Sequence, residues 1–264
     1  MTPAREVTVI VPLSRPAFVR DVFDNFKRQT FGRKRLVIVE NGDAVGACAA
    51  AGLVPDVLLT SANHQASARN EALAWMRDHG GGFFANFDDD DYYGSGYLAE
   101  VVEHSTRGEV IGKSSIFVRA AGGVLRLFEH EGDEQAVKFI HGPTMAAWSE
   151  DVGAFPIVSL GEDVKWIEAL RRKGATVWST SSFNFMQRRY PGFHHTWRMT
   201  DRQMVQCTRG RAFEVGPESR DVVNGLKVAP QCAVIPKAPP MPWDHPGSMT
   251  VGHQMNMEQQ CRTQ

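Results

Sequence analysis

The chain has 264 residues, of which 42% are hydrophobic and 22% are charged, and its formal net charge is -1. This length and composition are typical of a soluble globular protein with a substantial apolar core. The balanced charge excludes a protein that relies on a strong overall field to bind nucleic acid or anionic membranes, and it leaves room only for a local basic patch.

The cysteines and the first residues predict the compartment. The four cysteines include no C-x-x-C pair and no zinc-ligand spacing. Arg5 and Glu6 precede a short apolar run, a pattern typical of a strand and not of a signal peptide. No apolar stretch reaches the length of a membrane span. We therefore expect a cytoplasmic protein with free thiols, with peripheral contact to the inner face of the membrane as the alternative.

Strands and helices alternate in the first part of the predicted structure. Short runs rich in β-branched residues predict buried strands, and apolar residues three and four apart predict helices. This alternation implies βαβ units and a mainly parallel sheet, and therefore an α/β fold. The predicted elements are a strand at 7–13, a helix at 17–29, strands at 35–40 and 56–60, a helix at 64–80 and a strand at 83–87.

The second part of the chain predicts a mixed extension that shares the first sheet. Residues 109–120 and 124–130 flank a Gly-Gly pair and read as a hairpin. A helix at 161–174, a strand at 175–180 and an extended segment at 183–190 follow. Half of the 14 prolines lie at or after position 217, so we expect residues 201–264 to form an irregular tail behind a domain of residues 1–200.

Polar clusters follow three of the predicted parallel strands. They are Ser14-Arg15, Glu40-Asn41 and the run Asp88–Asp91. Ligands of open parallel sheets bind outside the carboxyl ends of the strands, so these clusters predict a binding site at one edge of the sheet.

The aspartate run is the most informative of these clusters. Four adjacent carboxylates repel one another, and a hard divalent cation such as Mn²⁺ or Mg²⁺ would offset the repulsion and bind a phosphorylated substrate. A solvated acidic loop, or a cap for a helix that begins near Gly96, is the alternative interpretation. In an extended segment Asp88 and Asp90 would face one site, whereas Asp89 and Asp91 would face away toward basic partners. A slip of one residue would exchange the two pairs.

Further candidate residues come from three other segments. Glu162 and Asp163 begin a predicted helix. There they either interact favourably with the helix dipole or supply a general base. Arg69, near the start of another helix, is either a surface residue or a partner for phosphate or for the aspartates. His194 and His195 are either structural or part of a metal or diphosphate site.

In this order, the segments VTVIVPLSRP, QTF, LVIVENGD, ARNEAL, FDDDDYY, GED and HHTW resemble the family 2 glycosyltransferases. The resemblance covers about residues 5–200 and implies the GT-A fold, with a nucleotide-binding half at about 5–105 and an acceptor half at about 106–200. Glu40 stands where the family usually has an aspartate, and the proline-rich tail has no counterpart that we can place.

The resemblance also implies roles for the residues. Asp163 would be the catalytic base, with Glu162 beside it. The metal would be held by Asp90, with Asp88 and His195, and the aspartate pair resembles a D-x-D motif. An acceptor wall would involve Met145, Trp148 and His194, although core packing is the better single explanation for the first two. The nucleotide sugar would be bound by Pro12, Leu13, Ser14, Arg15, Glu40, Asn41, Arg69, Asp88 and Asp89.

The expected function is a metal-dependent, inverting transfer of a sugar from a nucleotide-diphosphate sugar, UDP in the first instance, to an acceptor hydroxyl in bacterial surface glycan synthesis. Two alternatives stay open: a sugar nucleotidyltransferase, which would usually carry a Gly-rich loop after the first strand, and a non-catalytic nucleotide- or carbohydrate-binding module. We expect no nucleic acid partner, and self-association through the tail is an open alternative to an acceptor-covering role.

Overall fold

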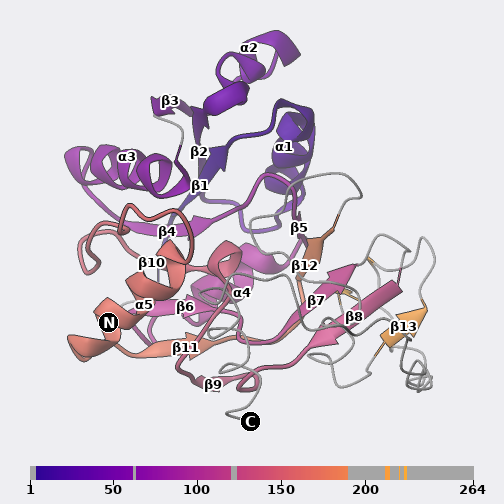
Figure 1. Ribbon diagram of the computed structural model, residues 1–264, viewed down its shortest axis with the longest axis vertical. Coiled ribbons are helices and arrows are strands. Elements are labelled where there is room, and N and C mark those ends of the chain that lie inside the picture. Colours follow the sequence, from indigo (N-terminus) through magenta and orange to yellow (C-terminus); the bar gives the residue numbers. More distant parts are fainter. Residues whose placement is uncertain are drawn as a thin grey trace, which may run out of the picture.

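The computed structural model describes residues 4–61, 64–119, 124–189, 212–214, 220 and 223–224. An eight-stranded sheet forms its centre, with the strand order β3-β2-β1-β4-β10-β6-β11-β9 (Figure 1). The strands are β1 (Val7–Leu13), β2 (Lys34–Asn41), β3 (Val57–Ser61), β4 (Phe83–Asn86), β6 (Val110–Gly112), β9 (Gln135–Ala136), β10 (Ala146–Trp148) and β11 (Val177–Ser179).

The first half of this sheet is parallel, as predicted. Strands β3, β2, β1 and β4 run in one direction, with Val9 opposite Leu36 on one side and Ala85 on the other. Beyond β4 the sheet is mixed, since β10 is antiparallel to both β4 and β6, whereas β11 is parallel to β6. The expected α/β fold with a mainly parallel central sheet is therefore confirmed.

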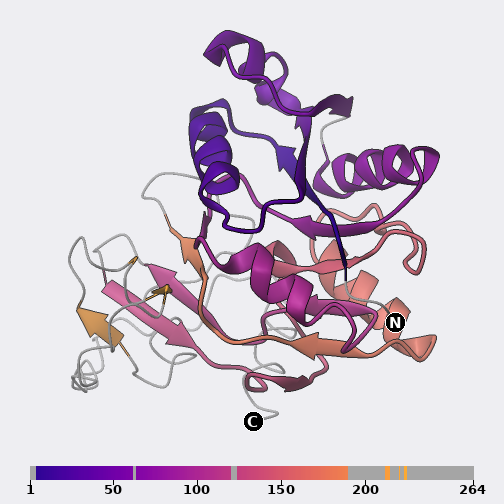
Figure 2. The same ribbon diagram turned by 180° about the vertical axis from the view of Figure 1, so that it is seen from behind.

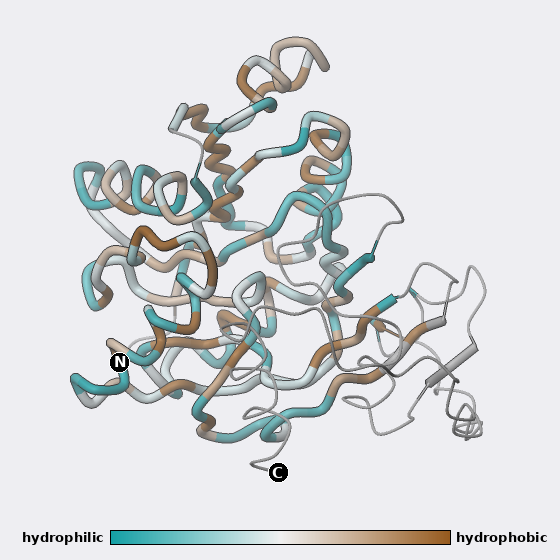
Figure 3. Tube along the Cα trace, viewed as in Figure 1, coloured by the Kyte–Doolittle hydropathy of each residue, from teal (hydrophilic) through white to brown (hydrophobic). Residues whose placement is uncertain are grey.

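Helices cover both faces of the sheet because residues in each strand alternate between two apolar clusters. Val9 and Val11 of β1 belong to one cluster, and Ile10 belongs to the other. Figures 1 and 2 show α3 and α5 on one side of the central strands and α1 and α4 on the other, and Figure 3 shows hydrophilic and hydrophobic segments alternating along α3. The first cluster includes α1 (Val19–Arg28), α2 (Ala47–Ala51) and α4 (Tyr97–Glu103), and the second includes α3 (Gln65–Asp78) and α5 (Glu162–Arg172).

Local signals explain the helix boundaries. Pro16 starts a 3₁₀ turn, η1 (Pro16–Phe18), which leads into α1, so the predicted helix at 17–29 is divided into two elements. At the end of α3 the chain enters the left-handed region at Gly80, with a φ of 98°. A residue with a Cβ is strained in this conformation, so the glycine ends the helix. Two further short 3₁₀ helices are η2 (Gly42–Ala44) and η3 (Gly142–Thr144).

A second sheet corrects the prediction that the later residues share only the first one. β6, β9, β10 and β11 extend the first sheet as expected, but the predicted hairpin partners β7 and β8 pair in a separate sheet. One of its strands falls in the range where we expected an irregular tail. The order of this sheet is β13 (Ala212–Glu214), β8 (Val124–Phe128), β7 (Ile116–Arg119), β12 (Phe185–Arg188) and β5 (Tyr92–Tyr93).

A buried lysine connects the two sheets where the chain passes between them. Lys113 follows β6, and its Nζ donates to a Glu100 carboxylate oxygen at 3.0 Å, to Thr180 Oγ1 at 3.0 Å and to the carbonyl oxygen of Ser181 at 2.7 Å. All three protons of the ammonium group therefore have acceptors, which offsets the cost of burying the charge. This network holds the chain between β6 and the second sheet.

Within the part of the chain that the structure describes, no helix is both long enough and apolar enough to cross a membrane.

Candidate active site

The aspartate run forms a turn between the two sheets. β4 ends at Asn86 in the first sheet, β5 begins at Tyr92 in the second, and the chain turns at residues 89 and 90. The Phe87 and Tyr93 rings stack with their centroids 3.7 Å apart, so the two arms of the turn pack against each other. The Tyr93 hydroxyl accepts the Asp88 N–H at 2.7 Å and donates to the Pro143 carbonyl oxygen at 2.9 Å.

This turn brings three of the four carboxylates together. Asp88, Asp90 and Asp91 each offer one oxygen, and these oxygens lie within 4.8 Å of one another. The expectation that Asp88 and Asp90 face the same site agrees with this geometry, but the expectation that Asp91 faces away was wrong. The strict alternation assumed for an extended segment ends at the turn, so the next side chain returns to the same side.

Two side chains from distant elements hold the main chain of the turn. Asn25 of α1 donates to the Asp91 carbonyl oxygen at 2.8 Å. Arg188 at the end of β12 donates to the carbonyl oxygens of Asp90 and Asp91 at 2.9 and 3.0 Å, and its main-chain N–H donates to Asp91 Oδ1 at 3.0 Å. The role of Asn25 had no sequence signal except that a polar residue lies among the apolar positions of its helix.

Asp89 binds the loop that follows β1. One of its oxygens accepts the N–H groups of Ser14 and Arg15 at 3.0 and 3.1 Å, and the Ser14 hydroxyl at 3.3 Å. The Arg15 guanidinium donates to the other oxygen through Nε at 3.0 Å and also through a second nitrogen. Asp89 is buried, so these bonds to a charged acceptor join the ends of β1 and β4 firmly.

Arg69 connects the turn to the start of α5. Its guanidinium donates to Asp88 Oδ1 at 3.1 Å and to Glu162 Oε1 at 2.8 Å, across 93 residues of sequence in the second case. The side chain is 2% exposed and lies over the Phe155 ring, 5.5 Å from its centroid. Arg69 is therefore a buried bridge between two acidic segments and not a surface residue.

Asp163, the candidate base, lies in the first turn of α5 beside this bridge. Its Oδ1 accepts the Val164 N–H at 2.8 Å. Its Oδ2 packs so closely against the Gly142 main chain that a Cβ at position 142 would lie 2.3 Å away. Burial raises the pKa of Asp163, the neighbouring Glu162 raises it further, and Arg69 opposes the shift. The short Gly-Pro sequence at 142–143 was the only signal for this contact, and sequence reasoning missed it.

The site carries more negative than positive charge. Burial raises the pKa of Asp88 to about 6, with added repulsion from Asp90 and Asp89. Burial also raises the pKa of Asp90, and it raises that of Asp91 well above the usual range. The site contains three arginines and six acidic residues. The arginines are Arg15, Arg69 and Arg188, and the acidic residues are Asp88, Asp89, Asp90, Asp91, Glu162 and Asp163.

These residues fit a divalent cation. The three clustered carboxylates are hard oxygen donors of the kind that Mg²⁺ and Mn²⁺ prefer, and their mutual repulsion would be offset by a bound cation. Magnesium-type sites commonly use one or two protein carboxylates and leave other positions for water and substrate phosphate. The arrangement suits a ligand that brings its own phosphate oxygens.

The predicted nucleotide-site residues other than Arg69 lie along the same edge of the sheet, with different environments. Ser14 and Arg15 meet the turn directly, whereas Pro12 and Leu13 are buried within β1. Glu40 is buried and accepts the N–H groups of Gly46 and Cys48 at 2.7 and 2.8 Å, so it anchors the loop before α2. Asn41 is also buried, and its side chain lies near its own strand, 3.4 Å from the Val39 carbonyl oxygen.

Trp148 and Met145 pack in the core, the interpretation that the sequence favoured for both. Trp148 pairs with Phe83 at the amino end of β4, the opposite end of the strand from the aspartates, and its ring contacts the Phe83 ring. Met145 is 0% exposed and belongs to an apolar cluster. His194 and His195 lie outside the described residues.

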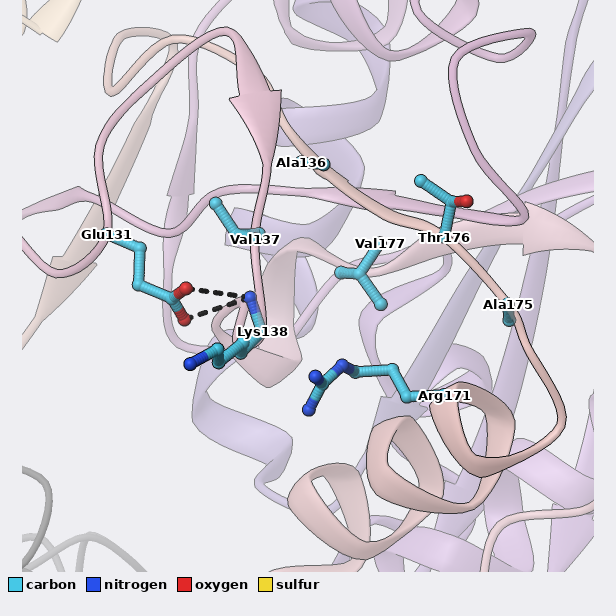
Figure 4. A pocket seen from close by; sticks show the side chains of 8 residues that line it. All are labelled: Glu131, Ala136, Val137, Lys138, Arg171, Ala175, Thr176 and Val177. Atoms are coloured by element: carbon cyan, nitrogen blue, oxygen red, sulfur yellow. Dashed lines mark hydrogen bonds between the residues drawn. The ribbon is translucent and has the colours of Figure 1, made fainter.

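A surface hollow lies elsewhere in the fold. It has a volume of about 330 Å³, and its lining includes Lys138, Arg171 and Thr176 (Figure 4). Thr176 immediately precedes β11, whose first residue pairs with the first residue of the parallel strand β6. The hollow is thus at the amino edge of the sheet and includes none of the aspartates.

The fold is one that known glycosyltransferases share. No protein-family model matches the sequence, and no curated protein sequence matches it. Among solved structures, the mannosyltransferase PcManGT from Pyrobaculum calidifontis, in complex with GDP-Man and Mn²⁺, is similar with a TM-score of 0.55 and 17% identity, over 79% of this chain and 65% of that one.

TarS from S. aureus (residues 1–349), in complex with UDP-GlcNAc, is similar with a TM-score of 0.54 and 16% identity, over 83% of this chain and 70% of that one. The chain therefore spans about two thirds of the length of each of these two solved chains. At these identities the likeness is one of fold: the mixed α/β architecture with a mainly parallel central sheet.

Proposed function

We propose that the protein is a glycosyltransferase of the family 2 type, which transfers a sugar from a nucleotide-diphosphate sugar to an acceptor hydroxyl with inversion. The observation that carries this proposal is the turn at the carboxyl end of β4. It brings the oxygens of Asp88, Asp90 and Asp91 within 4.8 Å, and Arg69 connects it to the pair Glu162-Asp163. A candidate cation site and a candidate base therefore lie on the two sides of one buried arginine.

Asp88, Asp90 and Asp91 would hold the divalent cation. A cation bound there would stabilise the negative charge that develops on the departing nucleoside diphosphate. His195 remains a predicted further ligand. The edge formed by Ser14, Arg15 and the β2–α2 loop would bind the nucleotide, since it adjoins the turn through Asp89.

Asp163 would act as the general base. Its carboxylate would take the proton of the acceptor hydroxyl while the acceptor oxygen bonds to the anomeric carbon and the bond from that carbon to the diphosphate oxygen breaks. A single displacement of this kind inverts the anomeric configuration. The raised pKa of Asp163, caused mainly by burial, makes the carboxylate a stronger base than an exposed aspartate.

The donor nucleotide is the least determined part of this proposal. A UDP sugar is the donor expected from the sequence, and the TarS complex contains UDP-GlcNAc, but the PcManGT complex contains GDP-Man. A thermal-shift screen with UDP, GDP, CDP and dTDP sugars plus Mn²⁺ identifies the donor, because a bound ligand stabilises the folded protein by mass action.

The substitution Asp163→Asn tests the catalytic assignment. With the donor found by the screen, we expect loss of sugar transfer and of donor hydrolysis by at least about 100-fold, with donor affinity retained. Glu168→Gln is the matched control, since Glu168 lies on the same helix and is exposed. Unchanged turnover in the Asp163 variant would refute its role as the base, and an NMR spectrum showing a retained anomeric configuration would refute the single displacement.

A further inference from the structure

Arg15 contacts an oxygen of a candidate cation ligand. Its guanidinium donates from one terminal nitrogen to Asp90 Oδ2 at 2.6 Å, while its other nitrogens donate to Asp89. Asp89 and Asp90 differ in their other contacts. Asp89 also accepts the main-chain N–H groups of Ser14 and Arg15, so its position does not depend on the guanidinium.

The guanidinium and a divalent cation would compete at Asp90. A hard divalent cation lies about 2.1 Å from its ligand oxygen. With the arginine nitrogen at 2.6 Å from the same carboxylate, two positive charges would lie within about 5 Å of each other. Their repulsion, in a region where Asp90 is only 8% exposed, opposes binding of both at once.

The surroundings of Arg15 allow it to move. Its side chain is 25% exposed, unlike that of Arg69, which is 2% exposed. The backbone at Arg15 is extended and precedes η1, so rotation of the side chain disturbs no helix. The guanidinium already lies 5.3 Å from the centroid of the Phe18 ring, in η1 after the loop predicted to bind the nucleotide.

We propose that Arg15 is an exchangeable counter-ion for Asp90, and this proposal rests on the proposed function. It neutralises Asp90 before the donor binds, leaves that oxygen when the cation binds, and then donates to the diphosphate. Because one guanidinium serves the carboxylate first and the phosphate afterwards, cation and nucleotide diphosphate bind cooperatively. Arg15 is thus a positioning residue that couples the two ligands.

The test measures Mn²⁺ binding by the EPR signal of the free ion, with and without nucleoside diphosphate. For Arg15→Met without nucleotide, we expect Mn²⁺ affinity to rise about tenfold over the unsubstituted protein, within the usual range of coupling between sites. With saturating nucleotide, the advantage should disappear, since the wild-type arginine then contacts phosphate. Arg15→Lys keeps the charge but loses the geometry that contacts two carboxylates. Its Mn²⁺ affinity without nucleotide should lie between those of Arg15→Met and the unsubstituted protein.

Arg35→Met is the matched control, because Arg35 pairs with Glu6 at 3.2 Å, on the surface and away from the turn. Its Mn²⁺ affinity should be unchanged. If Arg15→Met binds Mn²⁺ no more tightly than the unsubstituted protein, while that protein does bind the ion, the exchange is refuted and the metal site stands. If no variant binds Mn²⁺ at any nucleotide concentration, the proposed metal site fails, and the exchange fails with it.

Discussion

Gly142 controls the position of the candidate base. Its main chain lies against Asp163, and a Cβ at this position would be 2.3 Å from Oδ2. Contacts of a Cβ below 3.0 Å are essentially absent from proteins, so the carboxylate of a Gly142→Ala variant has to move by at least 0.7 Å. The backbone has no positive φ at this position, so alanine meets no left-handed strain there.

A shift of this size is small for folding but large for catalysis. Misplacement of a reacting group by about 1 Å can cost about 100-fold in rate. We expect Gly142→Ala to lower kcat by about 10- to 100-fold, with the donor KM and the unfolding midpoint close to those of the unsubstituted protein. The assay is steady-state sugar transfer, together with thermal unfolding followed by circular dichroism.

Gly153→Ala provides the matched control. A Cβ at Gly153 meets nothing within 4 Å, and the residue has no positive φ. Its kcat should be unchanged. If Gly142→Ala transfers sugar at the normal rate, either Asp163 is not the base or its position is not critical, and the reasoning from this contact is wrong.

Three further predictions concern charge. Arg69→Met should lower the free energy of unfolding by about 3–5 kcal/mol in urea titrations, because it leaves two buried carboxylates without their partner; a change below about 1 kcal/mol would contradict the buried bridge. Burial lowers the pKa of His141 to about 3, so between pH 6.5 and pH 3 the unfolded chain binds a proton at this residue and the folded protein does not. The free energy of unfolding therefore falls as the pH drops from 6.5 toward 3. Between pH 7 and pH 5 the free energy of unfolding should fall by about 2 kcal/mol less in His141→Gln than in the unsubstituted protein. Parallel curves of unfolding free energy against pH would refute this. Mn²⁺ affinity should fall as the pH drops through about 6, because the ion displaces protons from Asp88 and its neighbours, whose pKa values are raised; a pH-independent affinity in EPR titrations would argue against these ligands.

The parallel half of the fold could be predicted because its signals are local. β1 matches the predicted 7–13 range, β2 is one residue longer than predicted at each end, and β4 is one residue shorter at its carboxyl end, since each is an apolar run followed by polar residues. The second sheet could not be predicted in this way. A strand pattern at 116–119 shows that a strand forms, but it does not show which sheet the strand joins, and that depends on where Lys113 and its partners hold the chain.

The candidate site was predictable in its residue types and less so in its geometry. The position of the aspartates after β4 followed from the sheet, but the turn that returns Asp91 to the same side depends on Asn25 and Arg188, which are distant in sequence. The sequence left Trp148 open between the acceptor site and the core, because the direction of β10 is not readable from its three residues. Contacts across 93 residues, such as that between Arg69 and Glu162, leave no local pattern.

The central claim is that the turn at Asp88–Asp91 binds a nucleotide diphosphate through a divalent cation. Isothermal titration calorimetry of the nucleoside diphosphate found in the donor screen, with Mn²⁺ and with chelator, tests it most directly. We predict that the nucleotide affinity is at least about tenfold higher with Mn²⁺ than with chelator. This increase should be lost in Asp90→Asn and kept in Asp43→Asn, whose side chain is exposed. Equal affinity in Mn²⁺ and in chelator would contradict the account.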